Sequence, residues 1–206
     1  MENLELVLPE IFLSISIMFL LILGVFKKNS SKLIQTISLI VLLITTMITF
    51  NETLSIEKML LFNNSIIVDY LSSFMKMITL ISAFFVLLIS SSYLSIFKIL
   101  KIEYPILILS SVLGMMIMIS SNDLIVFYMG LELQSLALYV LATFNRDQLK
   151  SSEAGLKYFV LSALSSGLLL YGCSLIYGFT GSTNFNLIAS QLNSEEYALT
   201  FGIVFI

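Results

Sequence analysis

Long apolar runs, separated by short polar segments, dominate the chain. They cover about residues 11–26, 33–50, 72–97, 105–120, 124–144 and 153–179, and another run begins near residue 197. Because an α-helix rises about 1.5 Å per residue, roughly 20 residues cross the hydrocarbon core of a bilayer. The pattern predicts an all-α membrane protein, a polytopic bundle of about six transmembrane helices and the start of a seventh, in a single membrane domain over residues 1–206.

Composition agrees with a lipid surrounding. Hydrophobic residues make up 58% of the 206 residues and charged residues 11%, whereas soluble domains have about 45–50% and about 25%. The mean hydropathy is +1.03. The last apolar run, residues 197–206, is too short to cross a bilayer as a helix, so we expect the sequence to be an N-terminal fragment of a longer protein.

Charge and ligand chemistry exclude several classes of function. The net charge is −3 and no basic cluster is present, so a nucleic-acid partner is not expected. The chain has no histidine and a single cysteine, Cys173, so the usual haem, zinc and iron–sulfur ligand sets are missing. We expect no cofactor in this chain, and any redox chemistry belongs to other subunits.

The distribution of basic residues between loops predicts an orientation. Lysine and arginine are retained on the cytoplasmic side of a membrane. The loops after the first, third and fifth helices are the basic ones, and the other loops hold only Lys58; the basic loops contain Lys27, Lys28, Lys32, Lys98, Lys101, Arg146 and Lys150. The N-terminus is therefore predicted to face the periplasm or its equivalent.

Glu132 is the most informative single residue. It lies eight residues inside the fifth apolar run, roughly 12 Å along the helix. An ionised, unpaired carboxylate at this depth costs several kcal/mol, so the group either keeps a proton or faces a cation or water. Either state suits a proton relay, and the alternatives are a buried structural ion pair or a protonated packing residue.

Two lysines lie within apolar runs. Lys157 follows Glu153 by four residues in the sixth run, so the two can pair on one helix face; Lys157 is either a second relay residue or half of a helix-end charge pair. We expect the ammonium of Lys76 to snorkel to the interface, with a role in ion conduction as the alternative. Asp69 and Asp123 are interpreted as loop and helix-start residues.

The sequence of residues 127–185 resembles that of one protein family. This stretch includes MGLELQS around Glu132 and SSEAGLKYF around Lys157, and residues 8–11 (LPEI) fit the same family. The chain resembles the antiporter-like subunit N of NADH-quinone oxidoreductase (respiratory complex I), also called the NADH dehydrogenase subunit 2 family. The resemblance covers the whole sequence.

The resemblance implies a fourteen-helix fold with two inverted repeats, each with a broken helix. It implies a proton-translocating subunit, in which the glutamate matching Glu132 couples to lysines farther along the chain and the lysine matching Lys157 also takes part. Those farther lysines would fall beyond residue 206. NADH, flavin, iron–sulfur clusters and quinone would bind other subunits, and the partners would be the other membrane subunits of the complex, the lipid bilayer and protons.

Two other functions stay open at this point. A large subunit of a multisubunit sodium/proton antiporter resembles the respiratory subunits in the same region, and a non-conducting membrane scaffold would use Glu132 as a structural pair. A freestanding enzyme is disfavoured, because no nucleotide loop or metal set is present. The expected location is a bacterial inner membrane, with the mitochondrial inner membrane as the alternative.

Overall fold

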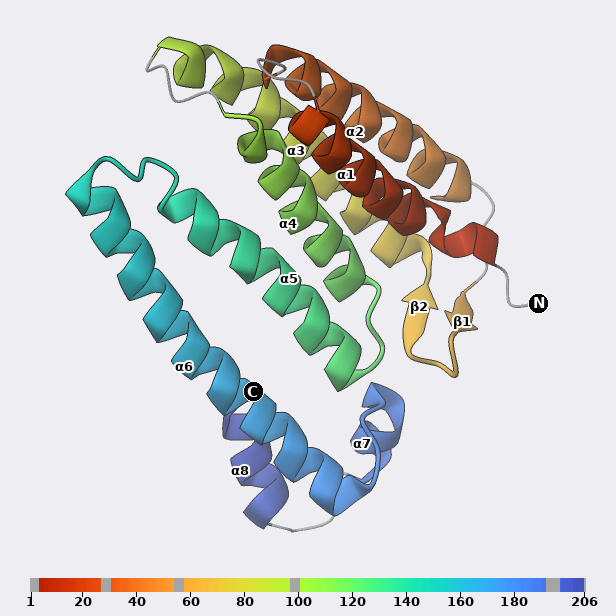
Figure 1. The fold of residues 1–206 in the computed structure, drawn as a ribbon. Coiled ribbons are helices and arrows are strands. Elements are labelled where there is room, and N and C mark those ends of the chain that lie inside the picture. The colour runs from red at the N-terminus through yellow and green to blue at the C-terminus, as the bar shows by residue number, and fades with distance from the viewer. Residues whose placement is uncertain (1–3, 27–30, 54–57, 97–100, 192–196, 206) are drawn as a thin grey trace.

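The chain folds into long antiparallel helices joined by short connections (Figure 1). The computed structural model describes residues 4–26, 31–53, 58–96, 101–191 and 197–205. After a short 3-10 turn, Leu4–Val7, the long helices are α1 (Leu8–Phe26), α2 (Ser31–Thr53), α3 (Tyr70–Ile96), α4 (Glu103–Ile119), α5 (Leu124–Ala142) and α6 (Leu149–Thr180). The six complete apolar runs each overlap one of these helices. The basic residues Lys27, Lys28 and Lys98, and residue 97 of the third run, lie outside the described residues.

Most of these helices have the dimensions of membrane spans. Within the described residues, five are long and apolar enough to cross a membrane: residues 5–26, α2, α3, α5 and α6. The sixth, α4, is equally apolar but has 17 residues. Large apolar side chains are widely exposed on the outer helix faces, a surface that suits lipid or other membrane helices better than water.

Helices α1 to α4 enclose the main apolar core. Its fully buried members come from all four helices and include Leu13, Leu20, Ile34, Leu42, Leu80, Leu87, Leu109 and Met116. In Figure 1, α4, α5 and α6 follow side by side, so α5 lies between α4 and α6. A short helix α7 (Phe185–Gln191) and α8 (Tyr197–Phe205) complete the described chain, and α8 packs against α6.

A small β-hairpin lies between α2 and α3, where the sequence analysis had no secondary structure. Strands β1 (Met59–Leu61) and β2 (Ile66–Val68) pair antiparallel. The turn between them places Phe62, Asn63 and Asn64 at positive φ, a conformation that asparagine tolerates better than most residues.

The hairpin turn is tied to two other connections at the same end of the molecule. The backbone oxygen of Asn64 accepts hydrogen bonds from the amides of Asn122, at 2.8 Å, and Asn184, at 2.9 Å. The Thr183 hydroxyl donates to the Asp123 carboxylate at 2.5 Å. The hairpin, the α4–α5 turn and the α6–α7 connection are thereby fixed to one another. We call this the hairpin end of the bundle.

Candidate functional site

Helix α5, which carries Glu132, begins at a defined cap. Asp123 has extended backbone angles, and its carboxylate oxygen Oδ1 accepts the backbone N–H of Ile125 at 2.8 Å. Such a side chain satisfies one of the free N–H groups in the first helical turn. The interpretation of Asp123 as a helix-start residue is confirmed, and the cap fixes where Glu132 lies along the helix.

A close crossing with α4 fixes the rotation of α5. A Cβ atom added to Gly114 would lie 2.6 Å from the backbone nitrogen of Gln134, and one added to Gly130 would lie 2.8 Å from the backbone nitrogen of Met118. Small residues allow helix backbones to approach this closely in membranes. Since Gly130 and Gln134 face α4, Glu132 lies on the other side of α5.

Glu132 therefore lies on the face of α5 that is turned toward α6. One turn before it, Tyr128 lies next to both the Glu132 carboxyl and Ser166 of α6. The carboxyl oxygen Oε1 of Glu132 is buried and makes no hydrogen bond within the part of the chain that the structure describes. No lysine or arginine among these residues pairs with it. A buried carboxyl oxygen without a partner costs free energy unless a proton, a cation or water satisfies it.

Lys157 has a different environment. Its ammonium lies 2.6 Å from a carboxylate oxygen of Glu153, four residues earlier on α6, and the two side chains are 67% and 55% exposed. Lys157 is two residues from Gly155, where α6 packs against Thr143, and two residues correspond to about 200° around a helix. The Lys157 side chain therefore points away from α5.

The structure does not bring Glu132 and Lys157 together. Tyr128 and Ser166 mark one level of the antiparallel α5–α6 pair, so Glu132 is level with about residue 162. Lys157 lies about five residues farther toward the opposite end, roughly 7 Å along the axis. Within the described residues, the two predicted relay groups are thus separate sites on different faces, and their roles stay predictions.

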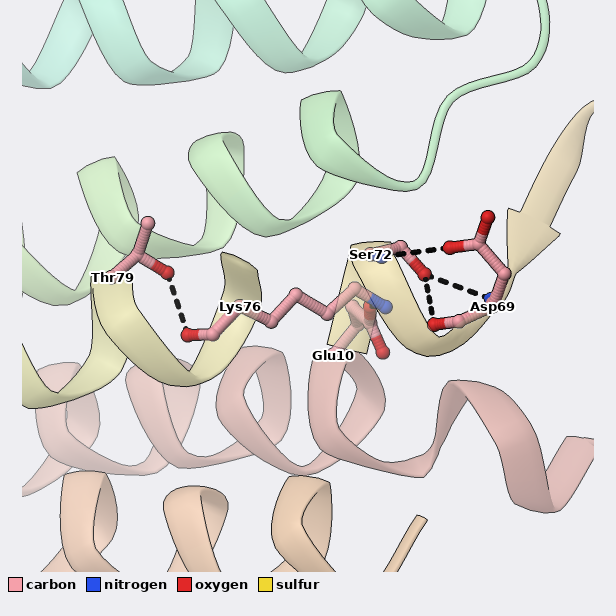
Figure 2. Close-up of polar contacts among 5 residues, drawn as sticks. All are labelled: Glu10, Asp69, Ser72, Lys76 and Thr79. Atoms are coloured by element: carbon pink, nitrogen blue, oxygen red, sulfur yellow. Dashed lines mark hydrogen bonds and ion pairs between the residues drawn. The ribbon is translucent and has the colours of Figure 1, made fainter. Parts of the chain in front are cut away.

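The prediction that Lys76 snorkels to the interface is wrong. Its side chain is only 2% exposed, and its ammonium lies 2.5 Å from the carboxylate of Glu10, which is 9% exposed. Figure 2 shows the Lys76 side chain extending back along α3 to meet Glu10 on α1. Helix α3 presents Lys76 to the bundle interior. There the Glu10 carboxylate supplies an opposite charge, which compensates for the hydration that the buried ammonium loses.

The sequence analysis missed this pair because it assigned no partner to Lys76 and no role to Glu10. A signal was available. Glu10 and Lys76 both lie near the start of odd-numbered helices, and alternating helices of a bundle begin at the same end. Beside the pair, Asp69 and Ser72 form a reciprocal cap at the start of α3, with bonds of 2.7 and 2.9 Å (Figure 2), so the reading of Asp69 as a loop residue is confirmed.

Comparisons with known proteins place the sequence. The family model described as "NADH:quinone oxidoreductase/Mrp antiporter, TM" matches residues 121–206, which include Glu132 and Lys157. NADH-quinone oxidoreductase subunit N of Pelagibacter ubique (strain HTCC1062) is 68% identical over 206 residues, which cover all of this chain and 44% of that protein. The chain belongs to the subunit N family. It spans less than half the length of the curated relatives it matches.

Solved structures agree with the fold expected for the subunit N family. A chain of respiratory complex I from Thermus thermophilus with bound aureothin superposes with a TM-score of 0.78 at 23% identity, covering 96% of this chain and 42% of that one. A chain of the Mrp complex from Dietzia sp. DQ12-45-1b superposes with a TM-score of 0.76 at 21% identity, covering 98% and 40%. The antiporter-like helical fold predicted from the sequence is confirmed.

Proposed function

We propose that this chain belongs to a proton-translocating membrane subunit of NADH-quinone oxidoreductase, in which Glu132 is a proton-relay group. The observation that carries the proposal is the buried Glu132 carboxyl oxygen, which has no hydrogen-bond partner within the described residues. Intramembrane ionisable groups are rare, and by default they mark ion pathways. The name of the relative that is 68% identical supports the assignment to this complex.

The relay works by changing the charge near Glu132. When a cation approaches, the ionised carboxylate is favoured and the proton leaves; when the cation withdraws, the carboxyl takes a proton from water in the bundle. An opposite charge nearby changes a carboxyl pKa by roughly 1–3 units, which is enough to switch its protonation. Tyr128 and Ser166 lie beside the carboxyl in the α5–α6 interface and offer hydroxyl groups for this transfer.

The redox chemistry that drives the relay belongs to other subunits in this proposal. NADH, flavin, iron–sulfur clusters and quinone bind there, and the chain itself contacts the other membrane subunits and lipid. The Pelagibacter ubique relative named above is bacterial, which supports an inner membrane location. The excess of basic residues in alternate loops supports a periplasmic N-terminus.

The proposal is tested with the complete subunit in its membrane complex, reconstituted into vesicles. NADH oxidation and internal acidification are measured together for wild type, Glu132→Gln and Glu132→Asp. Glu132→Gln keeps the size and hydrogen bonding of the side chain but cannot ionise, so we expect slower acidification, and Glu132→Asp should recover part of it. Glu103→Gln is the matched control, because Glu103 is exposed at the start of α4.

Two outcomes would contradict the proposal. If Glu132→Gln acidified the vesicles at the full rate and the complex failed to assemble with Glu132→Leu, Glu132 would have a structural role in the bundle and no role in proton transfer. Cation movement that requires sodium and proceeds without NADH oxidation would assign the chain to a sodium/proton antiporter.

A further inference from the structure

A second buried ionisable cluster lies in the first three helices, away from Glu132. Its centre is the pair of Glu10 on α1 and Lys76 on α3, whose side chains are more than nine-tenths buried. Glu52, near the end of α2, has its carboxyl oxygen Oε1 buried and lies within electrostatic range of both. With two carboxylates and one ammonium, the fully ionised cluster carries one excess negative charge.

The other carboxyl oxygen of Glu10 is left open by this arrangement. Lys76 contacts Oε1 of Glu10, whereas Oε2 is buried and has no hydrogen-bond partner among the described residues. A buried acceptor in this state costs about 1–3 kcal/mol unless water or a proton satisfies it. The geometry thus leaves one carboxylate oxygen available to a ligand.

A cavity adjoins this oxygen. It has a volume of about 320 Å³, and both Glu10 and Lys76 line it, together with Ser120 at the end of α4 and the hairpin residues Phe62, Ile66 and Val68. The Ser120 hydroxyl is also buried without a hydrogen-bond partner in the described chain. Most of its lining is apolar, and its polar groups are Glu10, Lys76, Ser14 and Ser120. A water in it would therefore lie at the Glu10 and Ser120 oxygens that have no other partner in the described chain.

The cavity lies under the hairpin end. The backbone N–H of Ile67 in β2 donates to the oxygen of Ser120 at 2.8 Å, so the hairpin covers the end of α4 beside the cavity. Ser120 therefore lies between the aqueous surface at the hairpin end and the Glu10–Lys76 pair. Water in the cavity would join the two by hydrogen bonds.

We propose that Glu10, Lys76 and Glu52 form a proton-exchange site that communicates with the hairpin end through this hydrated cavity. A hydronium in the cavity gives one proton to Oε2 of Glu10 and becomes water; the carboxylate becomes a neutral acid, and the excess negative charge of the cluster disappears. Removing a buried net charge is favourable, and the ammonium of Lys76 stays within electrostatic range of the carboxylate of Glu52. The reverse step returns the proton to the cavity.

The other titratable groups on the elements packed around the pair are exposed, capped or distant. Glu5, on the 3-10 turn before α1, is exposed. Asp69, at the start of α3, is held by its cap with Ser72. Helix α4, which also packs against α3, carries its ionisable residues Glu103 and Tyr104 at the opposite end. The apolar core of α1 to α4, with Val112 and Met116, separates the cluster from α5. The Glu10–Lys76–Glu52 site is thus distinct from Glu132. A role of this site in proton transport rests on the proposed function, but the exchange of a proton at the site does not.

The test is infrared difference spectroscopy of the complete complex in membranes, recorded as the pH is lowered. The carbonyl stretching band of a protonated carboxyl should appear in wild type and be lost in Glu10→Gln. Glu5→Gln is the matched control, since Glu5 is exposed at the same end, and it should keep the band. Ser120→Val, which removes the cavity hydroxyl, should slow hydrogen–deuterium exchange of the band severalfold.

If Glu10→Gln does not fold, the double variant Glu10→Gln/Lys76→Met removes the two charges of the ion pair together. It should fold and lack the Glu10 band. A wild-type band that persists unchanged in Glu10→Gln or in the double variant would overturn the proposal, and so would its absence in wild type. This test can fail or succeed separately from the proposed role of Glu132. Glu132→Gln should leave the band in place, whether or not the same variant slows acidification.

Discussion

Gly114 on α4 and Gly130 on α5 lie against each other's helix backbones, and this crossing sets the direction in which Glu132 points. A Cβ atom added to Gly114 would lie 2.7 Å from the backbone oxygen of Gly130. Backbone atoms cannot move aside as a flexible side chain can. The orientation of the relay residue therefore depends on two positions that have no side chain.

We predict that Gly130→Ala destabilises the subunit by about 1–3 kcal/mol, the usual range for overpacking a close contact. The added methyl group would lie 2.8 Å from the nitrogen of Met118. The measurement is the melting temperature of the purified subunit in detergent. Gly178→Ala is the control, because a Cβ at Gly178 meets nothing within 4 Å in the described structure; equal melting temperatures for the two variants would refute the crossing.

The buried Glu10–Lys76 pair predicts strong energetic coupling. Lys76→Met leaves a buried carboxylate without its cation and should cost about 3–5 kcal/mol, and Glu10→Gln should also destabilise. The double variant should lose less than the sum of the two single losses, with a coupling energy of about 1–3 kcal/mol. A double-mutant cycle of denaturant unfolding in detergent measures this. Additive losses would mean that the ion pair at 2.5 Å does not form.

Asp123 is predicted to stabilise the hairpin end in two ways. Its carboxylate caps α5 and also accepts the hydroxyl of Thr183. Asp123→Ala should cost about 1–2 kcal/mol, whereas Asp123→Asn keeps an oxygen for the cap and should cost less. Amide hydrogen exchange at Ile125 and Leu124 reports the loss directly. Unchanged protection in Asp123→Ala would show that the cap is dispensable.

Lys157 can be tested apart from its helical partner. The Glu153–Lys157 pair is exposed, so Glu153→Gln should change stability by less than about 0.5 kcal/mol. If Lys157 is a relay residue, Lys157→Met slows acidification of vesicles while Glu153→Gln does not. Equal acidification rates in both variants and wild type would show that Lys157 is not a relay residue and only forms the exposed ion pair with Glu153.

The apolar pattern was sufficient to predict the helices but not their relative rotations. Run length and spacing indicate each span, because the bilayer demands a minimum length, and the position of Glu132 along its helix follows from the sequence. Which face Lys76 presents depends on contacts with α1, whose residue Glu10 is 66 positions earlier. Snorkelling was predicted because depth alone was considered.

The hairpin was missed for a related reason. Its strands, Met59–Leu61 and Ile66–Val68, are each three residues long, too short for a recognisable alternation of polar and apolar residues. The adjacent Asn63 and Asn64 were a usable turn signal, since paired asparagines favour positive φ. The hydrogen bonds that join this turn to Asn122 and Asn184 link distant segments, and local sequence patterns do not indicate them.

If Glu132 carries protons, the number of protons moved per NADH oxidised depends on its carboxyl group. The ratio is measured in vesicles containing the complete complex, for Glu132→Gln and for the exposed control Glu103→Gln. We predict a lower ratio for Glu132→Gln and a wild-type ratio for Glu103→Gln. An unchanged ratio in Glu132→Gln, with normal assembly, would show that Glu132 does not carry protons.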